Sequence, residues 1–176
     1  YKKALASCRS ILADLGDNSE VYNNIALCHM HLGENHKAMK AYKKAISLDS
    51  RNIQAYITGS MIERAAGNNN SSVKVLEEAI NLHGRFPNLL VCLAQAYVRQ
   101  KNEVAAVELA DEACLKAPLV GSIVKTASSV FADCGSYGQA NSTLEEYIRR
   151  APNDKSTYGL YAGILAQIGE GDKAIE

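Results

Sequence analysis

The residues best able to do chemistry are three histidines, His29, His31 and His36, and 5 cysteines spread along the chain. A zinc site needs clustered cysteine or histidine ligands, and residues 29 and 31 of one helix point in different directions. The cysteines form no CxxC pair, and an odd number at irregular spacing is not a disulfide framework. We therefore expect no metal or cofactor, and the unpaired cysteines favour the cytoplasm over the periplasm.

Motifs for covalent or phosphoryl chemistry are also missing from the sequence. It contains no GxSxG elbow, phosphate-binding loop, dinucleotide-binding glycine pattern or HExxH. The formal net charge is +0, which argues against a dedicated nucleic-acid binder. No apolar run is long enough to span a membrane, and no signal peptide is visible. These observations predict that the chain is not an enzyme.

The elements that carry these residues are amphipathic helices. Between Asn18 and Asn52, apolar residues recur three and four positions apart in two runs. The first run predicts a helix from about Glu20 to Leu32 and the second a helix from about His36 to Leu48. Gly33 lies between them, where a left-handed residue can end a helix. The pattern indicates a helix–turn–helix hairpin.

This hairpin recurs with a period of 34 residues, without insertion or deletion. Two columns of the repeat stay small, as expected where paired helices approach closely. The turn column holds glycine except at Lys101, where we expect the neighbouring Asn102 to take the left-handed conformation. The first small column is Ala26, Ser60, Ala94, Ser128 and Ala162, and the second is Ala4, Ala38, Ser72, Ala106, Ala140 and Ala174.

The pattern of Tyr22, Ala26, Ala38, Tyr42 and Ala45 resembles the tetratricopeptide repeat (TPR), a helix–turn–helix unit of this length. The resemblance covers the whole chain and indicates no particular subfamily. It implies an all-α fold, a right-handed superhelical solenoid of TPR helix–turn–helix hairpins, in which each repeat packs on its neighbours.

We expect a single elongated domain over 1–176 with whole repeats at 19–52, 53–86, 87–120 and 121–154. A partial repeat precedes them at 1–18 and another follows at 155–176, its second helix beginning at 172–176. We interpret the chain as a fragment of a longer protein. Its incomplete ends predict fraying or end-to-end self-association through uncovered residues, namely Leu5, Ile11, Leu12, Tyr158, Tyr161 and Leu165.

In proteins that the chain resembles, the first helices of successive repeats line a concave groove that binds peptides or helices. The carboxylate clamp and the asparagine ladder known in such proteins are both interrupted here. The lining becomes small towards the end of the chain, at Ser129, Ala132, Gly159, Gly163 and Ala166. Carried over by position, the peptide-binding groove comprises Asn23, Asn24, Leu27, Met30, Ile57, Met61, Arg64, Val91, Gln95, Val98, Arg99, Lys125 and Ser129.

The types of these residues describe a partner. The apolar ones suit spaced apolar anchors, and Arg64 and Arg99 can hold carboxylates. We expect a protein segment with acidic flanks, helical rather than extended. The sequence thus predicts a non-enzymatic scaffold for protein–protein interaction. Three alternatives stay open: a TPR component of a bacterial envelope or pilus-assembly system, the recruiting arm of a larger enzyme, and a self-assembling structural solenoid.

Overall fold

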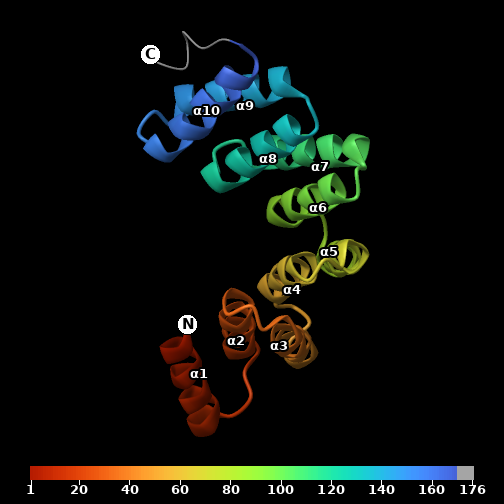
Figure 1. Ribbon diagram of the computed structural model, residues 1–176, viewed down its shortest axis with the longest axis vertical. Helices are drawn as coiled ribbons and strands as arrows, with labels where there is room; N and C mark the ends of the chain where they lie inside the picture. Colours follow the sequence, from red (N-terminus) through yellow and green to blue (C-terminus); the bar gives the residue numbers. More distant parts are fainter. Residues whose placement is uncertain (170–176) are drawn as a thin grey trace. The chain divides into compact units, whose positions relative to one another are not determined.

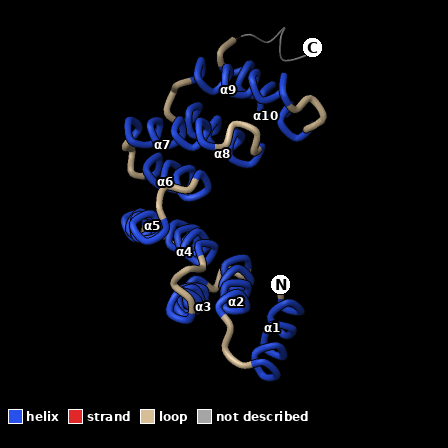
Figure 2. The backbone as a smooth tube through the Cα atoms, turned by 180° about the vertical axis from the view of Figure 1, so that it is seen from behind, coloured by secondary structure: helices blue, strands red, loops and turns tan. Residues whose placement is uncertain are grey.

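The computed structural model describes residues 1–169, and every regular element in that range is an α-helix. Short turns join successive helices (Figure 2). The all-α prediction is therefore confirmed. The helices are α1 (Lys2–Leu15), α2 (Ser19–His31), α3 (Asn35–Leu48), α4 (Ile53–Ala65), α5 (Asn69–His83), α6 (Pro87–Arg99), α7 (Glu103–Lys116), α8 (Gly121–Asp133), α9 (Tyr137–Arg150) and α10 (Lys155–Gln167).

Several helices begin where a side chain can satisfy a free backbone N–H of the first turn. Asn18 accepts a hydrogen bond from the Val21 N–H at 3.1 Å, and Asn52 accepts one from Ala55 at 3.1 Å. Asp154 does the same for Ser156 at 3.2 Å. These caps lie outside the apolar pattern, so they fix the start of α2, α4 and α10 independently of packing.

The turns inside the hairpins use the left-handed backbone conformation. Gly33, Gly67 and Gly135 have φ angles of 74°, 81° and 74°. In the third whole repeat Lys101 itself is left-handed, with φ 60°, so the expectation for Asn102 was wrong. Asn102 instead accepts a hydrogen bond from the Ala105 N–H and caps α7. Asn102 has φ −93° and ψ 73° as the cap, and the left-handed conformation falls on Lys101.

The chain divides into two compact units, which we call unit 1 (Tyr1–Gly84) and unit 2, which begins at Arg85. Unit 1 contains α1 and the hairpins α2–α3 and α4–α5, and unit 2 contains the hairpins α6–α7 and α8–α9 followed by α10 (Figure 1). In each unit the two helices of a hairpin pack together, the second helix packs on the first helix of the next hairpin, and the first helices of successive hairpins also contact each other. The predicted array therefore holds within each unit, and its continuity over 1–176 stays a prediction.

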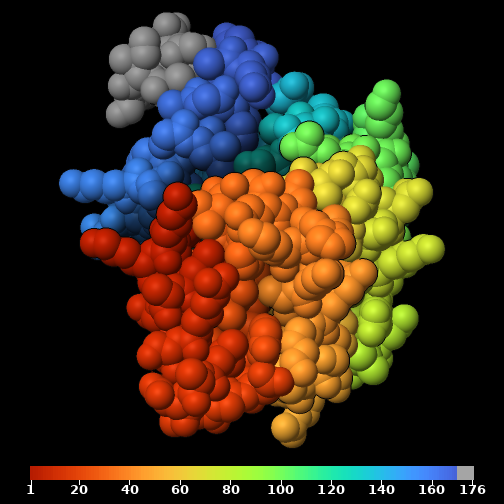
Figure 3. Space-filling model, turned by 60° about the horizontal axis from the view of Figure 1, so that its bottom comes forward, coloured from red at the N-terminus to blue at the C-terminus, as the bar shows by residue number. Residues whose placement is uncertain are grey.

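The core of unit 1 lies between its helices. Ala26 and Ala38 are fully buried, as the small columns predicted. Gly59 on α4 lets the Tyr42 ring of α3 approach closely, because a Cβ at this position would lie 2.7 Å from the ring. The atoms of α1 and α2 lie in contact in the space-filling view (Figure 3).

The core of unit 2 follows the same small columns, with Ala94, Ala106, Ser128 and Ala140 all at 0% exposure. At the ends of the described chain, Ile11 and Tyr158 are exposed as expected. Leu5 and Leu165 are buried, which corrects the expectation that they lack cover: each faces its neighbouring helix. Self-association stays a prediction. The expected second helix at 172–176 and its Ala174 lie outside the described residues.

Candidate functional site

In unit 1 the predicted site residues lie on α2 and α4, which pack side by side. Asn24 is exposed. Asn23 and Ile57 are buried, at 6% and 8% exposure, so they contribute little surface to any groove. The remaining predicted residues of this unit are half-buried and leave part of each side chain open to a partner: Leu27, Met30, Met61 and Arg64.

The burial of Asn23 leaves a polar atom without a partner. Its side-chain oxygen Oδ1 is inaccessible and accepts no hydrogen bond within residues 1–169. The Thr58 hydroxyl on α4 is in the same situation and is fully buried. An unsatisfied buried polar group costs about 1–3 kcal/mol, and most native ones are paired. The first-helix face of unit 1 therefore retains unused hydrogen-bonding capacity.

Two histidines of unit 1, His29 and His31, make contacts within the protein. His29 is buried at 6% exposure and its Nδ1 pairs with the Glu34 carboxylate. His29 is therefore a packing residue between α2 and the start of α3. The His31 ring stacks on Tyr1, with 4.4 Å between ring centroids. Among residues 1–169, no cluster of histidine, cysteine, aspartate or glutamate could hold a metal ion.

In unit 2 the predicted site residues lie on α6 and α8, which are again neighbours. Val91 is buried at 4% exposure, while Gln95, Val98 and Ser129 are half-buried and Arg99 is exposed. Lys125 is already engaged. Its ammonium donates to the Ser156 hydroxyl at 2.6 Å and lies 3.5 Å from the Asp154 carboxylate. Lys125 therefore joins α8 to the start of α10 and is less available to a ligand than expected.

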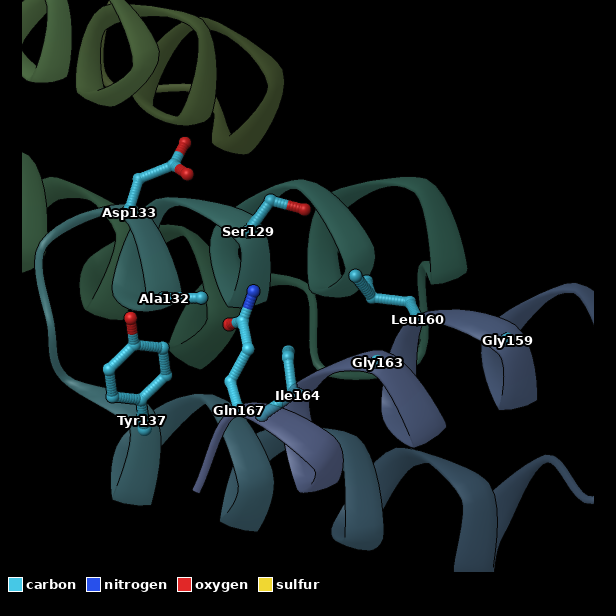
Figure 4. Close-up of a pocket in the computed structure, with 9 residues that line it drawn as sticks. All are labelled: Ser129, Ala132, Asp133, Tyr137, Gly159, Leu160, Gly163, Ile164 and Gln167. Carbon is cyan, nitrogen blue, oxygen red and sulfur yellow. The ribbon is translucent and has the colours of Figure 1, made fainter. Parts of the chain in front are cut away.

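A hollow of about 450 Å³ opens between α8 and α10 (Figure 4), and we call it the α8–α10 hollow. Its walls include Ser129, Ala132, Gly159 and Gly163, four of the small residues noted in the sequence. Leu160 and Ile164 add apolar surface from α10. Figure 4 shows the Ile164 side chain rising from α10 towards α8. The volume is sufficient for one or two side chains of a partner.

No neighbouring atom among residues 1–169 requires glycine at the two glycine positions of α10, Gly159 and Gly163. A Cβ built on Gly159 or Gly163 would meet no atom within 4 Å, and neither has a positive φ. Glycine inside a helix costs about 0.5–1 kcal/mol relative to alanine. Gly59 differs, because a ring of the same protein fills the space beside it. At Gly159 and Gly163 that space stays open.

The polar lining of the hollow contains one carboxylate beside hydroxyl and amide groups that can donate or accept hydrogen bonds. Asp133 is the one charged residue among the nine that line it, and the Tyr137 hydroxyl and Gln167 amide lie on the other side. Asp133 is exposed and makes no ion pair within residues 1–169. The pKa of the adjacent Cys134 is raised by burial, and then by the negative charges of Glu103 and Asp133. The rim of the hollow is therefore electronegative.

Sequence reasoning located part of this hollow and missed Tyr137, Ile164 and Gln167. The repeat pattern could have identified Gln167, because it lies one repeat after Asp133 at the corresponding position of the first helix. Tyr137 was missed because it begins the second helix α9, whereas only first helices were expected to line the groove. Its bulk fills one end of the space that the small residues leave open.

The described residues contain no membrane-spanning helix, and they form a second hollow. No helix among residues 1–169 is long and apolar enough to cross a membrane. A second hollow of about 450 Å³ lies between α7, α8 and α9, where Cys114 is one of the lining residues. Burial raises the pKa of Cys114 to about 11, so this thiol is a packing group and not a nucleophile.

The stacked helical hairpins of each unit define the class of protein, a helical-repeat solenoid. Comparison then shows the repeat type: the sequence model of the tetratricopeptide repeat matches residues 19–52, the first whole repeat. This match identifies residues 19–52 as a tetratricopeptide repeat, and the described residues share the fold of TPR solenoids, which supports the predicted resemblance to a generic TPR protein. No curated protein matches the chain.

Solved structures of TPR proteins share the fold. A thermophilic TPR protein from Thermus thermophilus is 18% identical, with TM-score 0.77 over 92% of this chain and 89% of that one. PilW, a type IV pilus biogenesis factor, is 16% identical, with TM-score 0.78 over 99% and 81%. YrrB, described as a TPR protein with an unusual peptide-binding site, is 17% identical, with TM-score 0.60 over 95% and 86%. Likeness at these identities shows the fold alone.

Proposed function

We propose that the chain is a non-enzymatic protein–protein interaction scaffold that binds a peptide or helix on the first-helix face of its hairpins. The observation that carries the proposal is the α8–α10 hollow. It is walled mainly by first helices, and the side chains of residues 1–169 leave the space above Gly159 and Gly163 unfilled. A partner that covered this surface would remove apolar area from water at no steric cost to the fold.

Unit 1 offers a second binding surface of the same kind. Leu27, Met30 and Met61 are half-buried on the adjacent helices α2 and α4. Methionine adapts to irregular apolar partners because its side chain is unbranched and polarisable. These features favour apolar anchors on the bound segment.

We assign Arg99 as the residue that binds the acidic flank of the proposed partner. This residue is exposed at the end of α6 and makes no ion pair within residues 1–169. Arg64, the other expected contact, is half-buried and already interacts within the chain. A carboxylate on the partner could pair with the Arg99 guanidinium through two parallel hydrogen bonds.

The proposal can be tested with helical peptides that are selected from a displayed library because they bind the purified chain. The purified chain would be compared with Met61→Glu in unit 1 and Ser129→Glu in unit 2, each of which places a charge where apolar contact is expected. Leu82→Glu is the matched control, since Leu82 is 57% exposed on the second helix α5. We expect the control to bind as the wild type and at least one first-helix variant to lose binding.

The proposal fails if both first-helix variants bind normally while Leu82→Glu does not. Loss in one variant alone would assign the site to that unit. Arg99→Ala should weaken binding and reduce its dependence on salt, because one charge pair is removed.

A second candidate is the role in pilus assembly or in the bacterial envelope. It is favoured by the likeness in fold to PilW, a type IV pilus biogenesis factor. Fractionation of cells that produce the protein discriminates the two: the envelope role requires the protein in the envelope fraction.

A further inference from the structure

The α8–α10 hollow carries a negative charge, whereas the contact proposed at Arg99 is positive. Asp133 is the one charged residue in its lining, and no basic residue takes part. Glu103 lies close enough to add its field at Cys134. The oxygens of Tyr137, Ser129 and Gln167 can all accept hydrogen bonds from a cationic donor.

The basic groups around the hollow do not neutralise Asp133. Lys125 is the basic residue on α8 itself, and it is held by Ser156 and Asp154 at the start of α10. Arg99 occupies the corresponding place one repeat earlier on α6, yet no ion pair joins it to Asp133. Asp133 therefore remains an open carboxylate beside an open space.

The shape of the hollow also suits a long cationic side chain. Ala132, Leu160 and Ile164 provide apolar wall for an aliphatic stem, and the polar groups stand at the rim. The face of the Tyr137 ring can hold a guanidinium by cation–π contact. Because Gly159 and Gly163 carry no side chains, a partner helix can come close enough to α10 for its side chain to reach Asp133.

We propose that the α8–α10 hollow binds a basic side chain, arginine or lysine, presented by an apolar helical segment of a partner protein. This inference rests on the proposed function and adds a basic residue to the description of the partner. The bound segment then carries an acidic residue for Arg99 and a basic residue for Asp133, one repeat apart along the first helices of unit 2. Such a pattern would distinguish this partner from one with a uniformly acidic face.

Two matched helical peptides test the site. Both are alanine-based with leucine at two positions one turn apart, and they differ only in carrying arginine or norleucine between the leucines. Their binding would be followed through the backbone amide NMR signals of Gly159 and Gly163, which report directly on the hollow. We expect the arginine peptide to bind wild-type protein about tenfold more tightly than the norleucine peptide, as for a charge-assisted hydrogen bond.

Asp133→Asn should abolish this preference while leaving the melting temperature unchanged, because Asp133 is exposed and unpaired within the described chain. Glu108→Gln, a charge removal at an exposed position of α7, is the matched control and should keep the preference. Gly163→Leu should fill the hollow and weaken both peptides, with thermal unfolding as the check that the variant is folded.

Equal affinity for the two peptides, or a preference that survives in Asp133→Asn, would overturn the inference. If both peptides bind equally and Gly163→Leu weakens both, the proposed function stands and only the charge assignment fails. Light scattering during the titration shows whether a second copy of the chain occupies the hollow, and we expect that it does not. Self-association that competes with the peptide and is lost in Asp133→Asn would contradict a separate partner.

Discussion

The Tyr42 hydroxyl on α3 donates a 2.6 Å hydrogen bond to the carboxylate of Glu63 on α4, and both residues are buried. The second oxygen of Glu63 accepts from the Asn68 side chain at 2.8 Å. Burial raises the pKa of Tyr42, and the bond to Glu63 raises it further, so tyrosine stays the donor. The pair joins two successive hairpins at a point where Gly59 permits close contact.

Tyr42→Phe should therefore destabilise unit 1. It keeps the ring but leaves a Glu63 oxygen short of a partner, at a cost of about 1–3 kcal/mol in the free energy of unfolding. Urea denaturation followed by circular dichroism measures the loss. The Tyr147 hydroxyl likewise donates to the Asp154 carboxylate at 3.0 Å, so Tyr147→Phe is the matched comparison. It should lose less, because the same oxygen of Asp154 still accepts from the Thr157 hydroxyl at 3.1 Å. A larger loss in Tyr147→Phe would contradict this interpretation.

The left-handed residue at 101 predicts a stabilising substitution. Lys101→Gly should raise the stability of unit 2 by about 1 kcal/mol or less, because glycine adopts φ 60° without steric cost. Gly135→Ala, in the corresponding turn of the next hairpin, should act in the opposite direction. Thermal unfolding of the two variants shows whether each melting temperature rises or falls. Destabilisation by Lys101→Gly would show that the Lys101 side chain makes stabilising contacts in the turn.

Much of this fold was predictable from the sequence. The small columns gave the closest contacts of paired helices, since Ala26, Ala38 and Ala94 are all fully buried. The turn column of Gly33, Gly67 and Gly135 pointed to Lys101 as the left-handed residue, whereas residue type favoured Asn102, which instead caps α7. For the site, helix positions indicated which face was open, but Asn23 and Ile57 are buried by neighbouring packing that a single helical face does not reveal.

The position of Ala94 gives a direct test of the repeat frame. Ala94→Leu adds three carbon atoms at a fully buried contact of α6 and should cost about 1–3 kcal/mol. Ala13→Leu at an exposed position of α1 is the control and should change stability by less than about 0.5 kcal/mol. An unchanged melting temperature in Ala94→Leu would place this residue outside the helix contact.

Asp154 predicts a dependence of stability on pH. Hydrogen bonds from Ser156, then Tyr147, lower the pKa of its carboxyl to about 2 from an ordinary value of 3.8. A lowered folded-state pKa contributes stability that is present above the unfolded-state pKa and is lost as the pH falls through the folded-state pKa. The stability difference between wild type and Asp154→Asn should therefore shrink between about pH 4 and pH 2. A difference that stays constant over this range would contradict the assignment.

The most direct measurement of the central claim is site-specific photo-crosslinking in cells that produce the whole protein. A photoreactive residue would replace Asn24 or Arg99, exposed on first helices, and in separate experiments Leu82 or Leu115, exposed on second helices. The account predicts that a partner segment is captured from positions 24 or 99, and that positions 82 and 115 give none of it. Capture of the same segment from 82 or 115 alone would place the binding surface on the second helices and contradict the account.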